Sequence, residues 1–192
     1  MQPRYDPRVF LALRFSRTTQ ERLLAVQDDL RQHLHNWHFI SPENFHLTLR
    51  FFGEVPEEQI TRIHEVCNAL SPSLHPFAMR LNHVDYFGTP HSARVLYAGG
   101  EHCAGLSKLV DAVQHEFPDQ RDKRTEFRPH VTLAKARAKM ERTIEVLNSV
   151  ALRRLREQGK IGKDVITIDS PTVHREFVLM ETNWVGRSVE YS

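Results

Sequence analysis

The stretch NFHLTLRF, at Asn44–Phe51, returns in a second form as RPHVTLAK at Arg128–Lys135. Both copies contain His, an apolar residue, Thr and Leu in that order, and their histidines, His46 and His130, lie 84 positions apart. Alternation of polar and apolar residues is typical of a half-buried strand, so each copy is predicted to be a strand. Because one copy falls in each half of the chain, the repeat favours two related lobes around a common cleft.

The repeated phrase is expected to present its polar side chains on one face. Successive side chains of a strand point to opposite faces. His46 and Thr48 should therefore lie together, with Cα atoms about 7 Å apart, while Leu47, Leu49 and Phe51 should face a core. His130 and Thr132 repeat the arrangement. Two such strands would offer two imidazoles and two hydroxyls to a single ligand.

A pair of imidazoles suits hydrolysis or transfer at phosphorus. One neutral ring can take a proton from the attacking oxygen, while one protonated ring gives a proton to the departing oxygen. The reference pKa of histidine, about 6.5, leaves both forms accessible near neutrality. Threonine hydroxyls can donate to the nonbridging phosphate oxygens. Neither a metal nor a cofactor is predicted, because the phrases bring no carboxylates or further imidazoles.

Structural alternatives exist for these histidines. A single His on a half-buried strand is ordinary, so the functional hypothesis depends on the duplication, since core packing requires neither His nor Thr. Another histidine cluster, HLHNWH, contains His33, His35 and His38 at a spacing that could suggest a metal site. It has no acidic partner and lies where a helix is expected to end, so no metal is assigned to it.

Length and composition favour a single domain. A chain of 192 residues can bury one core or two small lobes that share a seam. Its formal net charge of +2 is too small for nonspecific capture of a polyanion. Cys67 and Cys103 form no CxxC pattern and are expected to be reduced. Apolar runs are too short for a membrane helix or a secretory signal, so a cytoplasmic protein is predicted. It is also expected to be a monomer.

Strands and helices are predicted to alternate along the chain, which indicates the α+β class. Strands are expected at 9–15, 45–52, 77–86, 93–98, 129–136, 165–168, 173–180 and 188–191. Helices are expected at 18–33, 57–70, 103–116 and, singly or as a pair, at 139–158. No linker or low-complexity segment divides the sequence.

These motifs resemble the 2H phosphoesterase superfamily, and within it the RNA 2',3'-cyclic phosphodiesterase branch, historically called 2'-5' RNA ligase. The resemblance covers most of the chain, apart from an apparent addition at 138–165, and is looser over the final segment at 173–192. It is carried, in order, by RVFLALRF (8–15), PENFHLTL (42–49), FFGEV (51–55), YFGTPHSARVLYAGG (86–100) and FRPHVTLAK (127–135).

The resemblance implies a bilobal fold over residues 1–192, with two antiparallel sheets around a central cleft and helices outside. It implies that His46 and His130 are the acid and the base and that Thr48 and Thr132 bind the phosphate. We assign His46 as the acid and His130 as the base, although the sequence alone does not fix this order. Water would open a 2',3'-cyclic phosphate to a 2'-phosphomonoester, with the 3' oxygen leaving. Joining RNA ends through a 2'-5' linkage would use the same rings with exchanged roles.

Three basic residues near the phrases are further candidates for phosphate binding. Arg50 should share the face of His46 by parity, at a position where the family usually carries Lys. Arg128 should share the face of His130. Lys135 occupies a position where relatives often have Arg, but strict alternation places it on the face opposite His130, so a bulge would be needed.

The predicted activity is that of a metal-independent phosphodiesterase acting on RNA ends or small nucleotides that carry a 2',3'-cyclic phosphate. One alternative is a 2H enzyme for another small cyclic phosphate or for a 2'-5' oligonucleotide. A second alternative, from a different class, is a noncatalytic module that binds RNA ends. Turnover of a nucleoside 2',3'-cyclic phosphate in chelator would separate an enzyme from a binding module.

Overall fold

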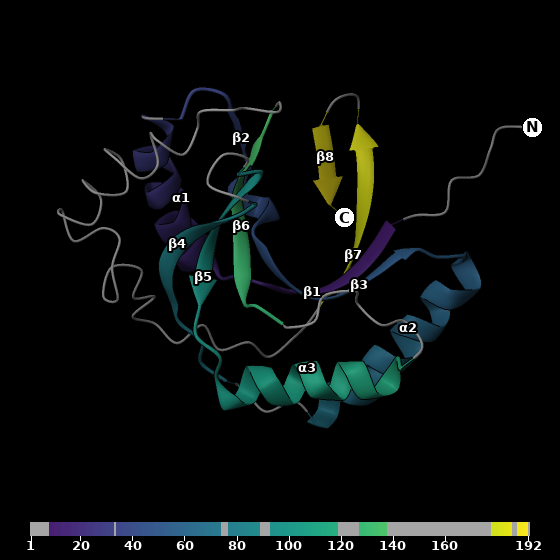
Figure 1. The fold of residues 1–192 in the computed structure, drawn as a ribbon. Helices are drawn as coiled ribbons and strands as arrows, with labels where there is room; N and C mark the ends of the chain where they lie inside the picture. Colours follow the sequence, from purple (N-terminus) through teal and green to yellow (C-terminus); the bar gives the residue numbers. More distant parts are fainter. Residues whose placement is uncertain are drawn as a thin grey trace, which may run out of the picture.

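The structure is a computed structural model that describes residues 8–32, 34–73, 77–88, 93–118, 127–137, 178–185 and 188–191. The segments expected at 139–158 and 165–168, and most of the strand expected at 173–180, lie outside the described residues. So does His33. The described elements form a curved sheet with helices packed against it (Figure 1).

Three helices are described: α1 (Arg17–Arg31), α2 (Glu57–Leu70) and α3 (Ala104–Glu116). Ser16 caps α1, since its hydroxyl accepts a hydrogen bond from the Thr19 amide. Pro56 precedes α2, whose bounds are those predicted from the sequence. Short 3-10 turns lie at η1 (Pro42–Asn44) and η2 (Ser71–Ser73). None of the helices in the described part of the chain is both long enough and apolar enough to cross a membrane.

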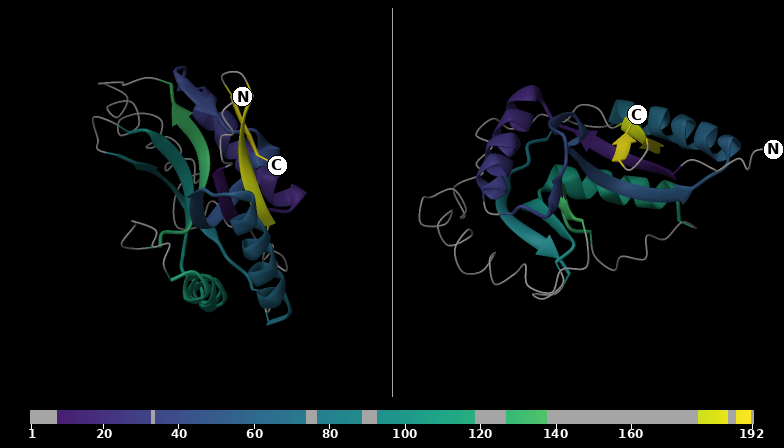
Figure 2. Two further views of the ribbon diagram at one scale, coloured as in Figure 1. Left: turned by 90° about the vertical axis from the view of Figure 1, so that its right-hand side faces the viewer. Right: turned by 90° about the horizontal axis from the view of Figure 1, so that it is seen from above.

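The strands described pair antiparallel throughout and form two halves of one sheet (Figures 1 and 2). The first half contains β2 (Trp37–Phe39), β4 (Leu81–Phe87), β5 (Val95–Gly100) and β6 (His130–Ala136). The second contains β1 (Arg8–Arg14), β3 (His46–Glu54), β7 (Val178–Val185) and β8 (Ser188–Tyr191). The halves meet between β3 and β6, where the register consists of one pair, Leu47 with Val131. The α+β class and the antiparallel arrangement are confirmed.

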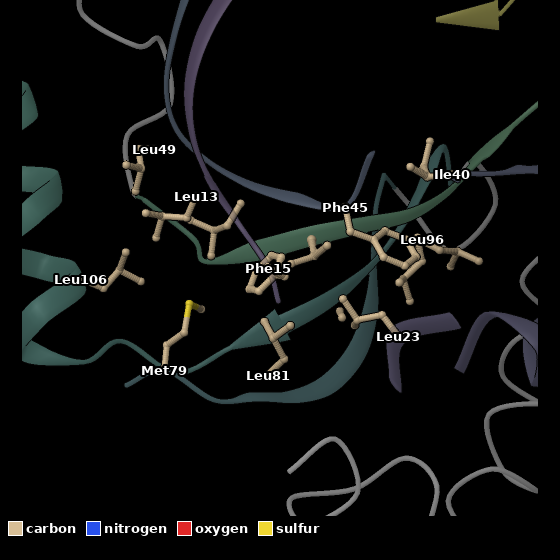
Figure 3. Packing of buried hydrophobic residues seen from close by; sticks show 14 of the residues in the cluster. Leu13, Phe15, Leu23, Ile40, Phe45, Leu49, Met79, Leu81, Leu96 and Leu106 are labelled. Atoms are coloured by element: carbon tan, nitrogen blue, oxygen red, sulfur yellow. The ribbon is translucent and has the colours of Figure 1, made fainter. Parts of the chain in front are cut away.

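The main hydrophobic core lies between the helices and one face of the sheet (Figure 3). All three helices contribute to it, for example through Leu23, Ile63 and Leu106, which are fully buried. Burial of a side chain of this size contributes about 1.5–3 kcal/mol to stability. A smaller cluster of Phe10 and Ala12 of β1 with Met180 of β7 covers the other face. Apolar side chains therefore hold β1 from both sides.

Candidate active site

The two repeated phrases lie side by side where the halves of the sheet meet. Leu47 and Val131 form an antiparallel pair and are fully buried. If this register is continued by one residue in each direction, the histidine of each strand lies across from the threonine of the other. The four polar side chains are half-buried and share the face opposite the main core: His46, Thr48, His130 and Thr132.

Each imidazole is oriented by an equivalent hydrogen bond to the backbone. Nδ1 of His46 lies 2.7 Å from the carbonyl oxygen of Asn44, and Nδ1 of His130 lies 2.8 Å from that of Arg128. A backbone carbonyl can only accept, so Nδ1 carries the hydrogen in each ring. Nε2 is consequently the nitrogen at which each ring can take up or release a proton. In both strands the acceptor is two residues before the histidine, so the duplication includes this contact.

Burial lowers the pKa of His46 from 6.5 to about 4. The hydrogen bond to Asn44 opposes this shift, while the positive charges of Lys135, His130 and Arg14 add to it. These charges act on His46 because the groups that carry them lie on neighbouring strands of the sheet. In the free protein His46 is therefore neutral at neutral pH.

A β-bulge in β3 places Arg50 in the core. Two neighbouring residues of β1 pair with Thr48 and Arg50, so Leu49 is an extra residue in the ladder. An extra residue reverses the faces of the residues that follow it. Arg50 is only 4% exposed, and its guanidinium donates to the carbonyl oxygen of Phe117. The prediction that Arg50 shares the face of His46 is therefore wrong.

A matching bulge in β6 has the opposite consequence for Lys135. Two neighbouring residues of β5 pair with Thr132 and Ala134, which leaves Leu133 as the extra residue. Leu133 and Ala134 are both buried. The bulge returns Lys135 to the face of His130, from which strict alternation had separated it. β6 thus contains the bulge that Lys135 needed in order to share the face of His130 and bind phosphate.

An aromatic surface that the sequence did not predict lies beside His46. Phe51 is 41% exposed, because the bulge that buries its neighbour turns it to the polar face. Its ring lies 6.4 Å from that of Phe10, and the Phe10 ring lies 4.9 Å from the imidazole of His46. Strict alternation would have placed Phe51 with the core leucines, so its exposure follows from the bulge alone.

His130 is held by aromatic contacts on its own side. Its ring makes an edge contact with Phe87 at 4.9 Å and lies 5.6 Å from Tyr97. The Tyr97 hydroxyl donates to the Asp85 carboxylate at 3.3 Å. Burial, and then the charge of Asp85, raises the pKa of Tyr97, while the nearby side chain of Arg128 acts to lower it. Arg128 therefore reaches the tyrosine that packs against His130.

Other candidate ligands are placed as follows. His38 is an exposed residue of β2 that pairs with Lys135, and His35 is exposed in the preceding turn. Within the described ranges, no three side chains of His, Cys, Asp or Glu converge as metal ligands would. Cys67 and Cys103 are free thiols, and burial raises the pKa of Cys67 to about 11.

Comparison with known proteins assigns the family. Residues 13–97 match the family described as LigT like Phosphoesterase. RNA 2',3'-cyclic phosphodiesterase of Methanothermobacter thermautotrophicus is 29% identical over 137 residues, which cover 70% of this chain and 74% of that protein. The enzyme of the same name from Aeropyrum pernix is 33% identical over 134 residues, covering 68% and 72%.

The fold agrees with this assignment. The crystal structure of E. coli LigT complexed with 3'-AMP superposes with a TM-score of 0.61 at 19% identity, covering 97% of this chain and 94% of that one. The shared fold extends over nearly the whole length of both chains. Sequence and fold together show that the chain belongs to the LigT-like family of 2H phosphoesterases.

Proposed function

We propose that this chain hydrolyses 2',3'-cyclic phosphates at RNA ends or on nucleotides to 2'-phosphomonoesters, without a metal ion, by acid–base catalysis with His46 and His130. The observation that carries the proposal is that two imidazoles, from different halves of the sheet, share one face, and that each is oriented by an equivalent hydrogen bond to a backbone carbonyl. The names of the relatives support the choice of a cyclic phosphate on RNA as the substrate class.

In the proposed reaction, Nε2 of one neutral imidazole removes a proton from water as the water oxygen attacks phosphorus. The bond from phosphorus to the 3' oxygen breaks, and Nε2 of the other, protonated imidazole donates a proton to that oxygen. The 2' oxygen keeps the phosphate. Hydroxyls of Thr48 and Thr132, together with the ammonium group of Lys135, would stabilise the charge on the nonbridging oxygens.

The lowered pKa of His46 bears on which ring is the acid. The assignment made from the sequence gives the acid role to His46, which requires a protonated ring. Burial keeps His46 neutral in the free protein. A bound phosphate would oppose this effect, because a nearby negative charge favours the imidazolium. The acid role of His46 therefore requires the substrate to raise its pKa, whereas the base role does not.

We expect His46 to titrate near pH 4 in the free protein and at higher pH when a phosphate monoester such as 3'-AMP is bound. NMR titration of the imidazole resonances, with the His46 signal assigned from a His46→Gln variant, measures both values. Adenosine, which lacks the phosphate, serves as the control and should leave the titration unchanged. A His46 ring that titrates at its ordinary pKa in the free protein would contradict this prediction.

Lys135→Met is expected to lower kcat/KM by about 10²-fold, the usual loss when one donor to a developing oxyanion is removed. Arg50→Met provides the matched comparison, since it removes a long basic side chain four residues after the histidine of the other strand. Because Arg50 faces the core, its replacement should change kcat/KM by about twofold or less while the protein stays folded. Equal losses of kcat/KM in the two variants would show that Arg50 also contributes to the site.

The proposed activity is tested directly with 2',3'-cyclic AMP and with an oligoribonucleotide that ends in a cyclic phosphate. Both are incubated with the protein in EDTA, and the 2'- and 3'-monoesters are separated. The 2'-monoester is the expected product. Formation of the 3'-monoester would overturn the proposed direction of ring opening. Binding of the oligonucleotide without turnover would favour a noncatalytic module that binds RNA ends.

A further inference from the structure

Arg14 extends the polar face by one strand beyond His46. The two residues are partners in the register of β1 and β3, so their side chains point to the same face with Cα atoms about 4.5–5.5 Å apart. Arg14 is exposed. It makes no hydrogen bond or ion pair with the residues that the structure describes. Because Arg14 is exposed, its guanidinium can contact a ligand that lies on this face.

Arg14 lies on one side of His46 and Lys135 on the other, because β1 and β6 are the two neighbours of β3. The exposed His38 of β2 pairs with Lys135 on the same side of β6 as β3, since β5 occupies the other side. Basic side chains thus follow one another across three neighbouring strands of the same face, β1, β3 and β6. A single reacting phosphate would already be surrounded by both histidines, both threonines and Lys135. Arg14 lies outside that set.

We propose that Arg14 binds a second phosphate of the substrate, the phosphodiester next to the terminal cyclic phosphate. This inference rests on the proposed function. Neighbouring strands are about 4.8 Å apart, and the arginine side chain extends beyond its own strand. The distance from the reacting phosphate to the Arg14 guanidinium is therefore similar in scale to the distance between successive phosphates of one RNA strand. The planar guanidinium can donate two parallel hydrogen bonds to one phosphodiester. The site would consequently prefer an RNA end to a cyclic mononucleotide.

The charge of Arg14 also acts on His46, and the test must separate the two effects. Removing this positive charge raises the pKa of His46 toward its ordinary value. A change in His46 alters the hydrolysis of every substrate alike, whereas a second phosphate contact affects only substrates that contain a second phosphate. The ratio of kcat/KM for a dinucleotide to kcat/KM for a mononucleotide therefore reports the contact alone.

The experiment measures that ratio with a diadenosine carrying one internal phosphodiester and a terminal 2',3'-cyclic phosphate, and with 2',3'-cyclic AMP. Arg14→Gln should lower the ratio by about tenfold, the effect of losing one charge-assisted hydrogen bond. Arg17→Gln is the control, because Arg17 is an exposed residue of α1 paired with Glu21. It removes the same charge and should retain the ratio of the unmodified protein.

Salt dependence provides a second readout. With the dinucleotide, the slope of log kcat/KM against log salt concentration should be smaller by about one in Arg14→Gln, since one phosphate contact is lost. Equal losses on both substrates would overturn the role of Arg14 in binding a second phosphate and leave the proposed hydrolysis intact. Absence of turnover of either substrate by the unmodified protein would overturn the proposed function and, with it, the role of Arg14.

Discussion

Replacing either His46 or His130 with alanine is expected to lower kcat for 2',3'-cyclic AMP by about 10²–10⁴-fold, the range that one positioned acid or base contributes. The two rings serve successive proton transfers of a single step. Removing one of them should therefore disable most of what the other contributes, and the double variant should lose much less than the product of the single losses.

The measurement is steady-state kinetics in EDTA across a range of pH, with product analysis at each point. His64→Ala serves as the control, because His64 is an exposed residue of α2, outside the polar face of the sheet. Its kcat should stay within about twofold of the unmodified protein, as is usual for surface substitutions. A single variant of His46 or His130 that keeps more than about one tenth of the activity would exclude the two-histidine mechanism.

Folding must be monitored in these variants, because the two histidines differ in their surroundings. The His46 ring packs against Phe10, and His130 packs against Phe87 and Tyr97. Thermal unfolding followed by circular dichroism identifies any variant whose loss of activity comes from unfolding. Replacement by glutamine in place of alanine keeps more of these contacts and should reduce activity by a similar factor.

Strand alternation predicted the faces of the residues from each histidine to the following threonine, because a half-buried strand has a period of two. It failed after the leucine that follows in each copy, at Arg50 and Ala134. Leu49 and Leu133 are each an extra residue in the ladder, and nothing in the repeated letters reveals a bulge. This single cause explains the wrong placement of Arg50 and the need for an irregularity at Lys135.

Other elements of the fold differed in how well the sequence predicted them. The helix at 57–70 had an apolar stripe between two prolines and was predicted with its observed bounds. β2 was not predicted, since three residues are too few to show a period, and its pairing depends on distant residues of β6. The single bilobal domain, the monomeric state and the cytoplasmic location remain predictions.

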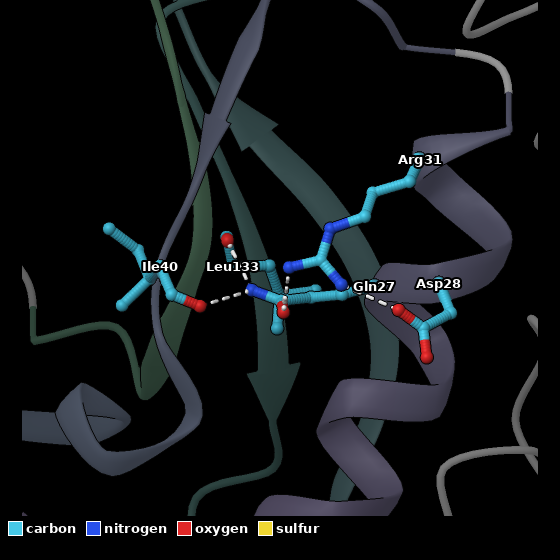
Figure 4. A network of polar contacts seen from close by, with 5 residues as sticks. All are labelled: Gln27, Asp28, Arg31, Ile40 and Leu133. Atoms are coloured by element: carbon cyan, nitrogen blue, oxygen red, sulfur yellow. Dashed lines mark hydrogen bonds and ion pairs between the residues drawn. The ribbon is translucent and has the colours of Figure 1, made fainter.

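Gln27 illustrates a polar residue whose importance only the structure explains. In the sequence it belongs to the stripe that α1 presents to the core, together with Leu23 and Leu30. In the structure it is fully buried, and its side-chain amide donates to the carbonyl oxygens of Ile40 at 2.8 Å and Leu133 at 2.7 Å (Figure 4). Gln27 therefore joins α1 to the bulge residue of β6, two positions before Lys135.

Gln27→Leu is expected to lower the free energy of unfolding by about 2–4 kcal/mol, because a leucine of similar size fills the space but satisfies neither carbonyl. Ile40 would lose its side-chain partner, while the Leu133 carbonyl would keep the hydrogen bond that it accepts from the Ile40 amide. Arg31, which donates to the Gln27 carbonyl oxygen at 3.3 Å, would lose that acceptor. Urea denaturation at 25 °C measures the change.

The control for this substitution is Gln32→Leu, the same change at an exposed residue that follows α1. It should alter the free energy of unfolding by about 0.5 kcal/mol or less. Because Gln27 fixes the bulge that turns Lys135 to the face of His130, Gln27→Leu should also lower kcat/KM under conditions where the protein stays folded. A loss of stability below about 1 kcal/mol would mean that water or a rearranged backbone satisfies the carbonyls, and that Gln27 does not anchor the bulge.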